Sequence, residues 1–214
     1  MGLSDSMDTR ATMGITYLRN AVEAIPTVRA LLLYGAASWS FLLLFGGVIT
    51  VVPLLVASRY TLDATEIGLL ITTALLVTAL ISLLNGRLTR ILSTATLLSL
   101  GFIGYGLGLA GAGLATSPVL IAAALVVFGV DHGLVFPTLT TAISGLAGSQ
   151  YRAGVMSIRT SMLMLGQAVS PWLFTLVGVR IDYPLLLFGV GVCSVVFGGS
   201  TLLVVQTDNH PTLN

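Results

Sequence analysis

The sequence predicts an all-α, polytopic membrane protein with six transmembrane helices. Of its 214 residues, 56% are apolar and only 8% are charged, whereas soluble domains carry about 25% charged residues. The mean hydropathy is +1.02. The apolar residues also lie in long runs without a charge, as a chain that crosses a bilayer requires. Together these observations make lipid the main solvent of the chain.

The composition excludes several classes of soluble protein. Nine arginines and no lysine are balanced by eight acidic residues, so the chain is not a strongly basic nucleic-acid binder. Cys193 is the only cysteine, which excludes a disulfide scaffold and a cysteine-based metal site. The sequence has no phosphate-binding loop, no G-x-S-x-G elbow and no H-E-x-x-H motif. We therefore expect no soluble-enzyme activity, no metal and no cofactor.

Six apolar stretches are predicted to be transmembrane helices, because a helix needs about 20 residues to cross the hydrocarbon core. The longest charge-free run, 91–130, would be about 60 Å long as one helix, roughly twice the core thickness. It is therefore divided into two helices at Thr116-Ser117-Pro118, since proline suits the first turn of a new helix. The predicted spans are 30–58, 67–86, 91–115, 119–146, 155–179 and 183–205.

The positions of the arginines predict that both termini lie in the cytoplasm, as expected for a multi-pass protein of the plasma or inner membrane. The outside loops then hold only Arg59 and Arg180, in agreement with the positive-inside rule. The inside segments hold Arg10, Arg19, Arg29, Arg87, Arg90 and Arg152.

The predicted organisation is a cytoplasmic segment, 1–29, a membrane domain, 30–206, and a cytoplasmic tail, 207–214. Apolar residues recur at helical spacing in the first segment, which favours a helix in the membrane interface. A partly ordered tail is the alternative. The apolar positions are Ile15, Leu18, Val22 and Ile25.

Two ionisable residues near the middle of the fourth span are the main candidates for function. Asp131 lies about 18 Å into the helix, close to the bilayer centre, where an aspartate costs about 2.5–3.5 kcal/mol to insert. Such a carboxyl group is a candidate for proton coupling, and the alternative is a carboxyl held by hydrogen bonds between helices. His132 is a candidate proton relay, because histidine titrates near neutral pH, or a hydrogen-bonded packing residue.

The fifth span carries the third ionisable residue, Arg159, about 10 Å inside the cytoplasmic end. This arginine either snorkels to the interface, binds an anionic group or pairs with a carboxylate. A polar stripe at helical spacing on the same span indicates a protein interface or a wet cavity, and comprises Ser157, Thr160, Ser161, Met164 and Gln167. The candidate contacts for a solute are Arg159, Gln167, Thr160 and Ser157.

Glycines and prolines inside the spans predict close packing and bends. Small residues in a G-x-x-x-G pair let two helices approach closely. Prolines free backbone carbonyls, which membranes tolerate at bends. The glycine pairs are Gly104 with Gly108 and Gly129 with Gly133, and the prolines are Pro53, Pro137 and Pro171.

Four passages together resemble the major facilitator superfamily of secondary transporters, and more narrowly the C-terminal six-helix half of a twelve-helix member. They are residues 51–55 with 63–70, 85–90, 128–137, and 151–157 with 165–167 and 170–171. The resemblance covers about residues 15 to 205, and the stretch 17–20 is similar to the linker between halves.

One passage, 85–90, is similar to the conserved loop that follows the second helix of a half. Its candidate gating residues are Gly86, Arg87 and Arg90, although Thr89 stands where an aspartate is usual.

The resemblance implies half of a bundle, built from two inverted triplets of helices. In such a half, the first and fourth helices line a central cavity, the second and fifth face the other half, and the third and sixth lie outside. It implies a secondary transporter, or its C-terminal half, that moves a small solute by proton-coupled alternating access.

The partners implied are the lipid bilayer, the solute, protons and a second six-helix half, supplied by a homodimer or by a separate N-terminal half. The alternative functions are a membrane scaffold or non-functional transporter fragment, and an intramembrane enzyme that uses Asp131 and His132.

Overall fold

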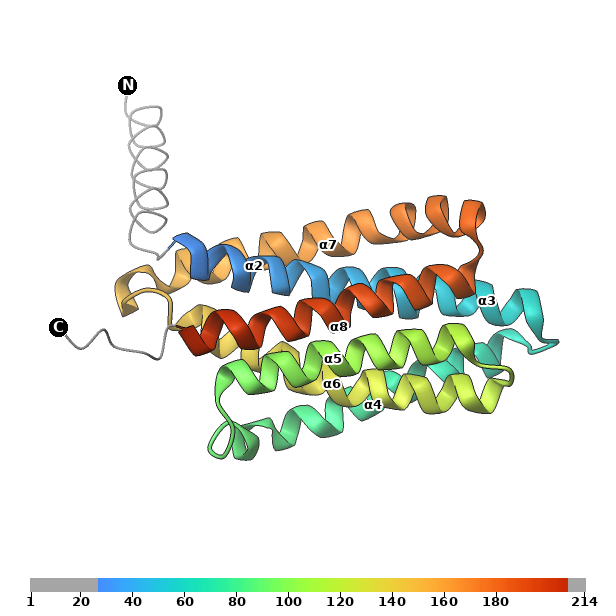
Figure 1. Cartoon of the computed structure of the whole chain (residues 1–214), viewed down its shortest axis with the longest axis horizontal. Helices are drawn as coiled ribbons and strands as arrows, with labels where there is room; N and C mark the ends of the chain where they lie inside the picture. The colour runs from blue at the N-terminus through green and yellow to red at the C-terminus, as the bar shows by residue number, and fades with distance from the viewer. Residues whose placement is uncertain (1–26, 208–214) are drawn as a thin grey trace, which may run out of the picture.

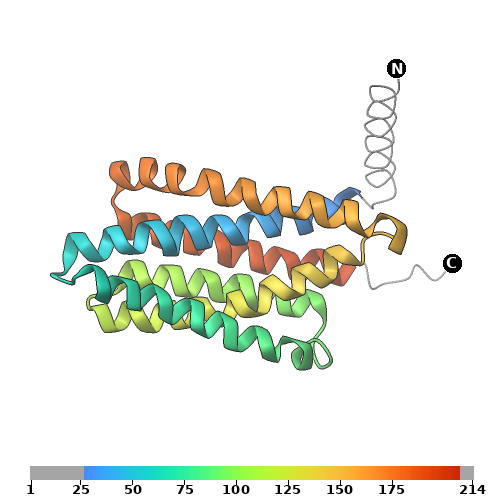
Figure 2. The same ribbon diagram turned by 180° about the vertical axis from the view of Figure 1, so that it is seen from behind.

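The computed structural model describes residues 27–207, which form a bundle of long helices (Figure 1, Figure 2). Within these residues there are no strands, and six helices are long and apolar enough to cross a membrane. The prediction of an all-α protein with six spans is therefore confirmed. The first helix begins and the last helix ends at the same end of the bundle. The predicted interfacial helix, the linker-like stretch and nearly all of the tail lie outside the described residues.

The first span consists of α2 (Thr27–Leu42), a π-helix η1 (Leu43–Val51) and α3 (Val52–Arg59). The other spans are α4 (Ala64–Leu88), α5 (Thr94–Leu114), α6 (Pro118–Ser144), α7 (Arg152–Ile181) and α8 (Tyr183–Thr207), with a 3-10 turn η2 (Ser149–Tyr151) before α7.

Polar residues beside the apolar runs set the helix ends. The Asp63 carboxylate accepts hydrogen bonds from the backbone N–H groups of Thr65 and Glu66, and the Glu66 side chain accepts one from the Asp63 N–H. This capping box starts α4 three residues before the predicted span. Ser117 caps α6 through the N–H of Leu120, and Pro118 is the first residue of that helix, as the sequence predicts.

The first span changes its winding in the middle, which the sequence did not predict. In η1, the Thr50 hydroxyl donates to the Phe45 carbonyl, five residues back, at 2.7 Å. A Cβ on Gly46 would lie 2.7 Å from the Phe174 ring of α7, so the absence of a side chain here lets the two helices approach. Pro53 follows directly, at the start of α3, where its missing N–H is tolerated.

Close contact between α4 and α6 is built from glycines and hydroxyl groups. The Thr78 hydroxyl of α4 donates to the Gly129 carbonyl of α6 at 3.1 Å. Pro137 cannot donate to the Gly133 carbonyl four residues before it, and this carbonyl accepts a hydrogen bond from the Ser82 hydroxyl at 3.3 Å instead. The helix therefore continues through Pro137, because α4 supplies the missing donor.

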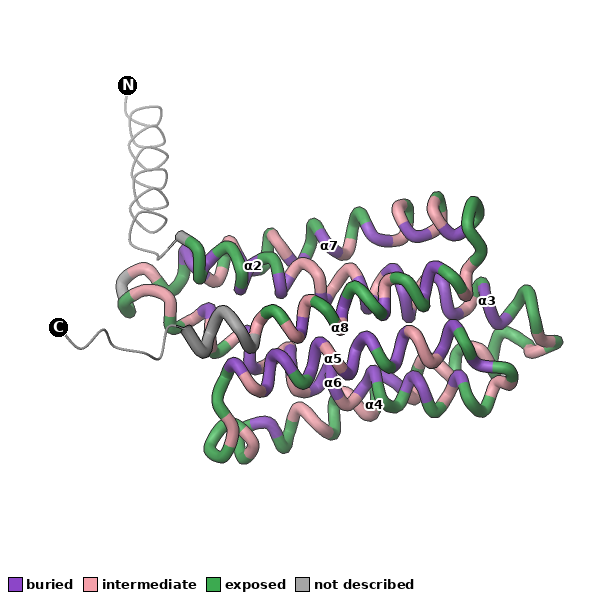
Figure 3. The backbone as a smooth tube through the Cα atoms, viewed as in Figure 1, coloured by how far each residue is buried: buried purple, intermediate pink, exposed green. Residues whose placement is uncertain are grey.

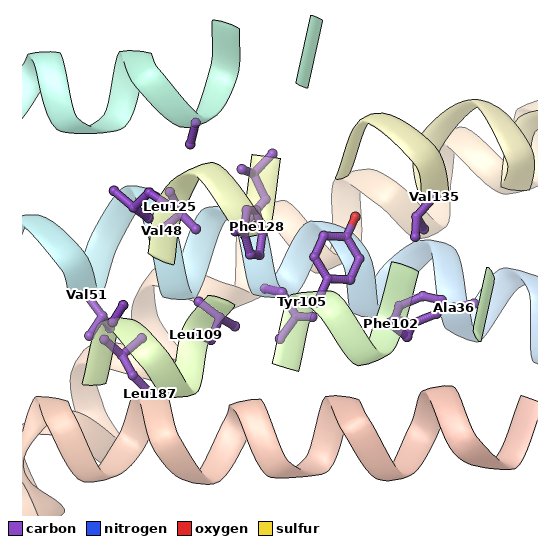
Figure 4. Close-up of a cluster of buried hydrophobic side chains, with 14 of the residues drawn as sticks. Ala36, Val48, Val51, Phe102, Tyr105, Leu109, Leu125, Phe128, Val135 and Leu187 are labelled. Atoms are coloured by element: carbon purple, nitrogen blue, oxygen red, sulfur yellow. The ribbon is translucent and has the colours of Figure 1, made fainter. Parts of the chain in front are cut away.

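Exposure differs strongly between the spans (Figure 3). Helix α5 packs between α6 and α8 and is the most buried span, with Thr94 and a stripe of leucines left exposed. Helix α4 is the least buried, because it touches little apart from α6. The core lies where the first span, α5 and α6 meet, around Phe102, Tyr105, Leu109, Leu125 and Phe128 (Figure 4).

We predict that Gly129→Ala lowers the free energy of unfolding by about 1–3 kcal/mol, the usual cost of overpacking. A Cβ at this position would lie 2.5 Å from the Ala74 carbonyl oxygen of α4, and a backbone atom cannot move aside. Denaturant titration in detergent measures the effect. Gly189→Ala on α8 is the control, because a Cβ there meets nothing within 4 Å. Equal stability of the two variants would contradict the packing argument.

Candidate functional site

Asp131 lies in the contact between α6 and α5, where it is 8% exposed. A Cβ built on Gly104 of α5 would collide with the Asp131 carboxyl group, so this group occupies the space that a side chain at 104 would fill. No hydrogen bond to the carboxyl group is made by any described residue. The candidate proton site, Asp131, therefore packs directly against the candidate packing glycine, Gly104.

His132 points into a cluster of aromatic rings and is 5% exposed. Its Nδ1 shares a hydrogen bond of 2.5 Å with the Tyr105 hydroxyl of α5. Phe128 and Phe136, one turn away on α6, stack on the imidazole with ring centroids at 5.9 and 6.1 Å, and Phe41 of α2 lies at 6.3 Å. The Tyr105 ring lies at 5.7 Å, so the imidazole is fixed by one hydrogen bond and by rings from three helices.

Tyr105 is a site residue that the sequence did not single out. It is fully buried, and its hydroxyl points away from α5 (Figure 4). Gly104 and Tyr105 are adjacent on α5, as are Asp131 and His132 on α6, so the two pairs face each other. The signal in the sequence was a single tyrosine in a span whose other polar residues are only serine and threonine, and such a tyrosine is equally typical of ordinary packing.

Arg159 turns inward from α7 and is 6% exposed. Its Nη2 donates to the Thr140 hydroxyl of α6 at 2.8 Å, and the guanidinium carbon lies 4.8 Å from the centroid of the Phe136 ring. The Nε atom is buried without a hydrogen-bond partner. Within the described residues no carboxylate approaches the guanidinium, so the structure shows neither snorkelling to the surface nor an ion pair.

The polar stripe on α7 lies on another side of the helix from Arg159. Ser157, Thr160 and Ser161 are exposed, as is Met164, and Gln167 is half-buried. The Thr160 and Ser161 hydroxyls donate to carbonyls four residues back in the same helix, at 3.0 and 3.2 Å. The structure therefore leaves the stripe uncovered and separates it from Arg159.

The remaining candidates lie near helix ends or in helix contacts. Gly86, Arg87 and Arg90 are exposed at the end of α4, next to the buried Asn85, which accepts a hydrogen bond from Thr138 at 3.3 Å. Helix α7 continues through Pro171, and the Gln167 carbonyl that this proline leaves free accepts the Ser170 hydroxyl at 3.3 Å. Gly108 packs against the Phe128 backbone of α6.

Comparison with protein families gives one match that covers most of the chain. The model described as the Major Facilitator Superfamily matches residues 32–213. A comparison with curated proteins finds no match.

We predict that Tyr105→Phe lowers the free energy of unfolding by about 1–3 kcal/mol, because it leaves the buried imidazole nitrogen of His132 without its partner. Denaturant titration in detergent measures this change. Tyr183→Phe serves as the control, since the Tyr183 hydroxyl makes no hydrogen bond within the described part of the chain. A loss no larger than that of the control would show that the hydrogen bond contributes little.

Proposed function

Because the chain belongs to the major facilitator superfamily of transporters, we propose that it acts as the C-terminal half of a secondary active transporter, which moves a small solute by alternating access. Six spans, with the first beginning and the last ending at one end of the bundle, fit such a half. The observation that carries the proposal is the placement of ionisable side chains inside this bundle. Asp131, His132 and Arg159 are all buried between helices, where a purely structural bundle needs none of them.

We propose a second six-helix half as partner, from a second copy or a separate N-terminal half. Two spans support this proposal, since α4 and α7 show much of their surface (Figure 3). On α7 the uncovered surface includes the stripe of Ser157, Thr160 and Ser161. A second half that covers this stripe would place Gln167, Thr160 and Ser157 at the boundary of a cavity, where they would contact the solute from another side of α7 than Arg159.

We propose Asp131 as the proton site and His132 as a relay. The support is geometric: the carboxyl group has no hydrogen-bond partner among the described residues, so it is free to bind and release a proton without breaking a structural bond. The hydrogen bond between His132 and Tyr105 lies one residue further along both helices. We propose that protons pass between the carboxyl group and this pair of side chains.

We predict that Asp131→Asn abolishes proton-coupled solute flux, because the amide cannot carry the proton. The measurement follows the internal pH of proteoliposomes while a panel of small solutes is applied, with the chain alone and with a partner half. Asp63→Asn is the matched control: Asp63 is exposed at the start of α4, and asparagine caps a helix equally well. Unchanged coupling in Asp131→Asn would remove this role from Asp131. A stable monomer without flux in either setting would favour a scaffold.

We propose that both termini lie in the cytoplasm. Arg29, Arg87, Arg90 and Arg152 lie at the end of the bundle where the first span begins, and Arg59 and Arg180 lie at the opposite end. The end of the bundle with more arginines is expected to lie on the cytoplasmic side.

The orientation is tested with Thr61→Cys and Thr89→Cys, each in a Cys193→Ser background. Both threonines are exposed, Thr61 between α3 and α4 and Thr89 at the end of α4. On intact cells a membrane-impermeant maleimide should label the Thr61→Cys variant, and should reach the Thr89→Cys variant only after permeabilisation. The reverse pattern would place the termini outside.

A further inference from the structure

Arg159 is the only arginine located inside the described bundle rather than at a helix end. Its guanidinium keeps its charge in proteins, yet it contacts only a hydroxyl and a ring face. The acids Asp63, Glu66 and Asp182 lie at helix ends, and Asp131 is turned towards Gly104 of α5. A buried charge without a counter-charge is costly. The site therefore favours an anion supplied from outside these residues.

The donors that remain on the guanidinium define the shape of this anion. A guanidinium presents five N–H groups in a planar fork, which matches the two oxygens of a carboxylate. The Thr140 hydroxyl accepts one hydrogen bond from Nη2 and donates its own proton to the Phe136 carbonyl, whereas Nε has no acceptor at all. One edge of the fork is thus left for a planar acceptor. The other arginines of the described residues lie at helix ends, away from this site, so a single negative charge is balanced best.

An aromatic strip leads away from the guanidinium. The half-buried Phe136 ring lies beneath it at 4.8 Å. The ring of Phe41 lies 5.8 Å from that of Phe136, and the ring of Phe45 lies 5.7 Å from that of Phe41. These two rings are also only half-buried. The strip offers apolar surface to a ligand that is held at its charged end by Arg159.

We propose that the Arg159 guanidinium, which Thr140 holds in position, binds the carboxylate of a monocarboxylate solute, whose apolar body packs along Phe136, Phe41 and Phe45. This inference rests on the proposed function, because it names the solute class of that transporter. The rival source of a carboxylate is an acidic side chain of the second half.

The test compares benzoate with benzamide, which has the same ring and a similar shape but no charge. Calorimetric titration is carried out on the full chain in lipid nanodiscs. Wild type is expected to bind benzoate saturably and benzamide at least about tenfold more weakly, as expected for a charge-assisted pair. Arg159→Gln is expected to lower benzoate affinity at least about tenfold and to leave benzamide binding unchanged.

A second pair of variants guards against a folding defect in Arg159→Gln. Thr140→Val keeps the arginine and the side-chain shape but removes the hydroxyl, and is expected to weaken benzoate binding severalfold. Thr141→Val is the matched control, since the exposed Thr141 hydroxyl only donates to the Pro137 carbonyl of its own helix. It is expected to bind benzoate as wild type does, and all variants are compared at matched thermal stability.

Four results would overturn the inference: equal affinity for benzoate and benzamide, unchanged benzoate binding in Arg159→Gln, equal effects of Thr140→Val and Thr141→Val, and no benzoate binding by a folded chain. Weaker association between halves in Arg159→Gln, with benzoate affinity unchanged, would identify the acidic side chain of a second half as the partner. Benzoate binding without any flux would contradict the proposed transport but keep the site. Solute flux that benzoate does not affect would support the proposed transport but contradict the carboxylate site.

Discussion

The positions of Asp131 and His132 depend on how closely α6 approaches its neighbours. On one side, Gly129 and Gly133 bring its backbone against α4, where hydroxyl groups satisfy its carbonyls. On the other side, Gly104 of α5 leaves the space into which Asp131 fits. The hydrocarbon contains no water that could bind a free carbonyl or fill a gap, so either defect costs free energy. The close packing of α6 therefore also determines where its carboxyl group lies.

The two charged candidates lie on opposite sides of α6, and this arrangement has an electrostatic consequence. Asp131 and the Arg159 partner Thr140 are nine residues apart, which is about 14 Å along the axis and about half a turn around it. A proton bound at one site and a monocarboxylate bound at the other bring opposite charges. The loaded bundle then gains no net charge, which lowers the cost of moving the cargo through a medium of low dielectric constant. Separate sites for the two would also avoid direct competition between them.

The sequence was sufficient to predict the spans, because their signals are local. Charged residues bound the apolar runs, and Ser117 with Pro118 marks the division between the third and fourth helices. The direction in which a side chain points depends on contacts between helices instead. Sequence reasoning therefore grouped Arg159 with Thr160, although the structure buries the first and exposes the second. The bond between Tyr105 and His132, like the π-helical turn near Gly46, arises from tertiary packing and has no local signature.

The uncovered faces of α4 and α7 raise the question of how such a half tolerates lipid. The leucines exposed on α4, such as Leu80 and Leu83, are as apolar as the lipid chains. The exposed hydroxyls of Thr160 and Ser161 donate to carbonyls of their own helix, so they need no partner from elsewhere. Lipid contact therefore leaves few unsatisfied groups on either face. Association with the proposed second half would then be driven by shape and hydrogen bonding rather than by a hydrophobic force, which is weak between helices in a bilayer. Such an interface would open and close at low cost, as the proposed alternating access requires.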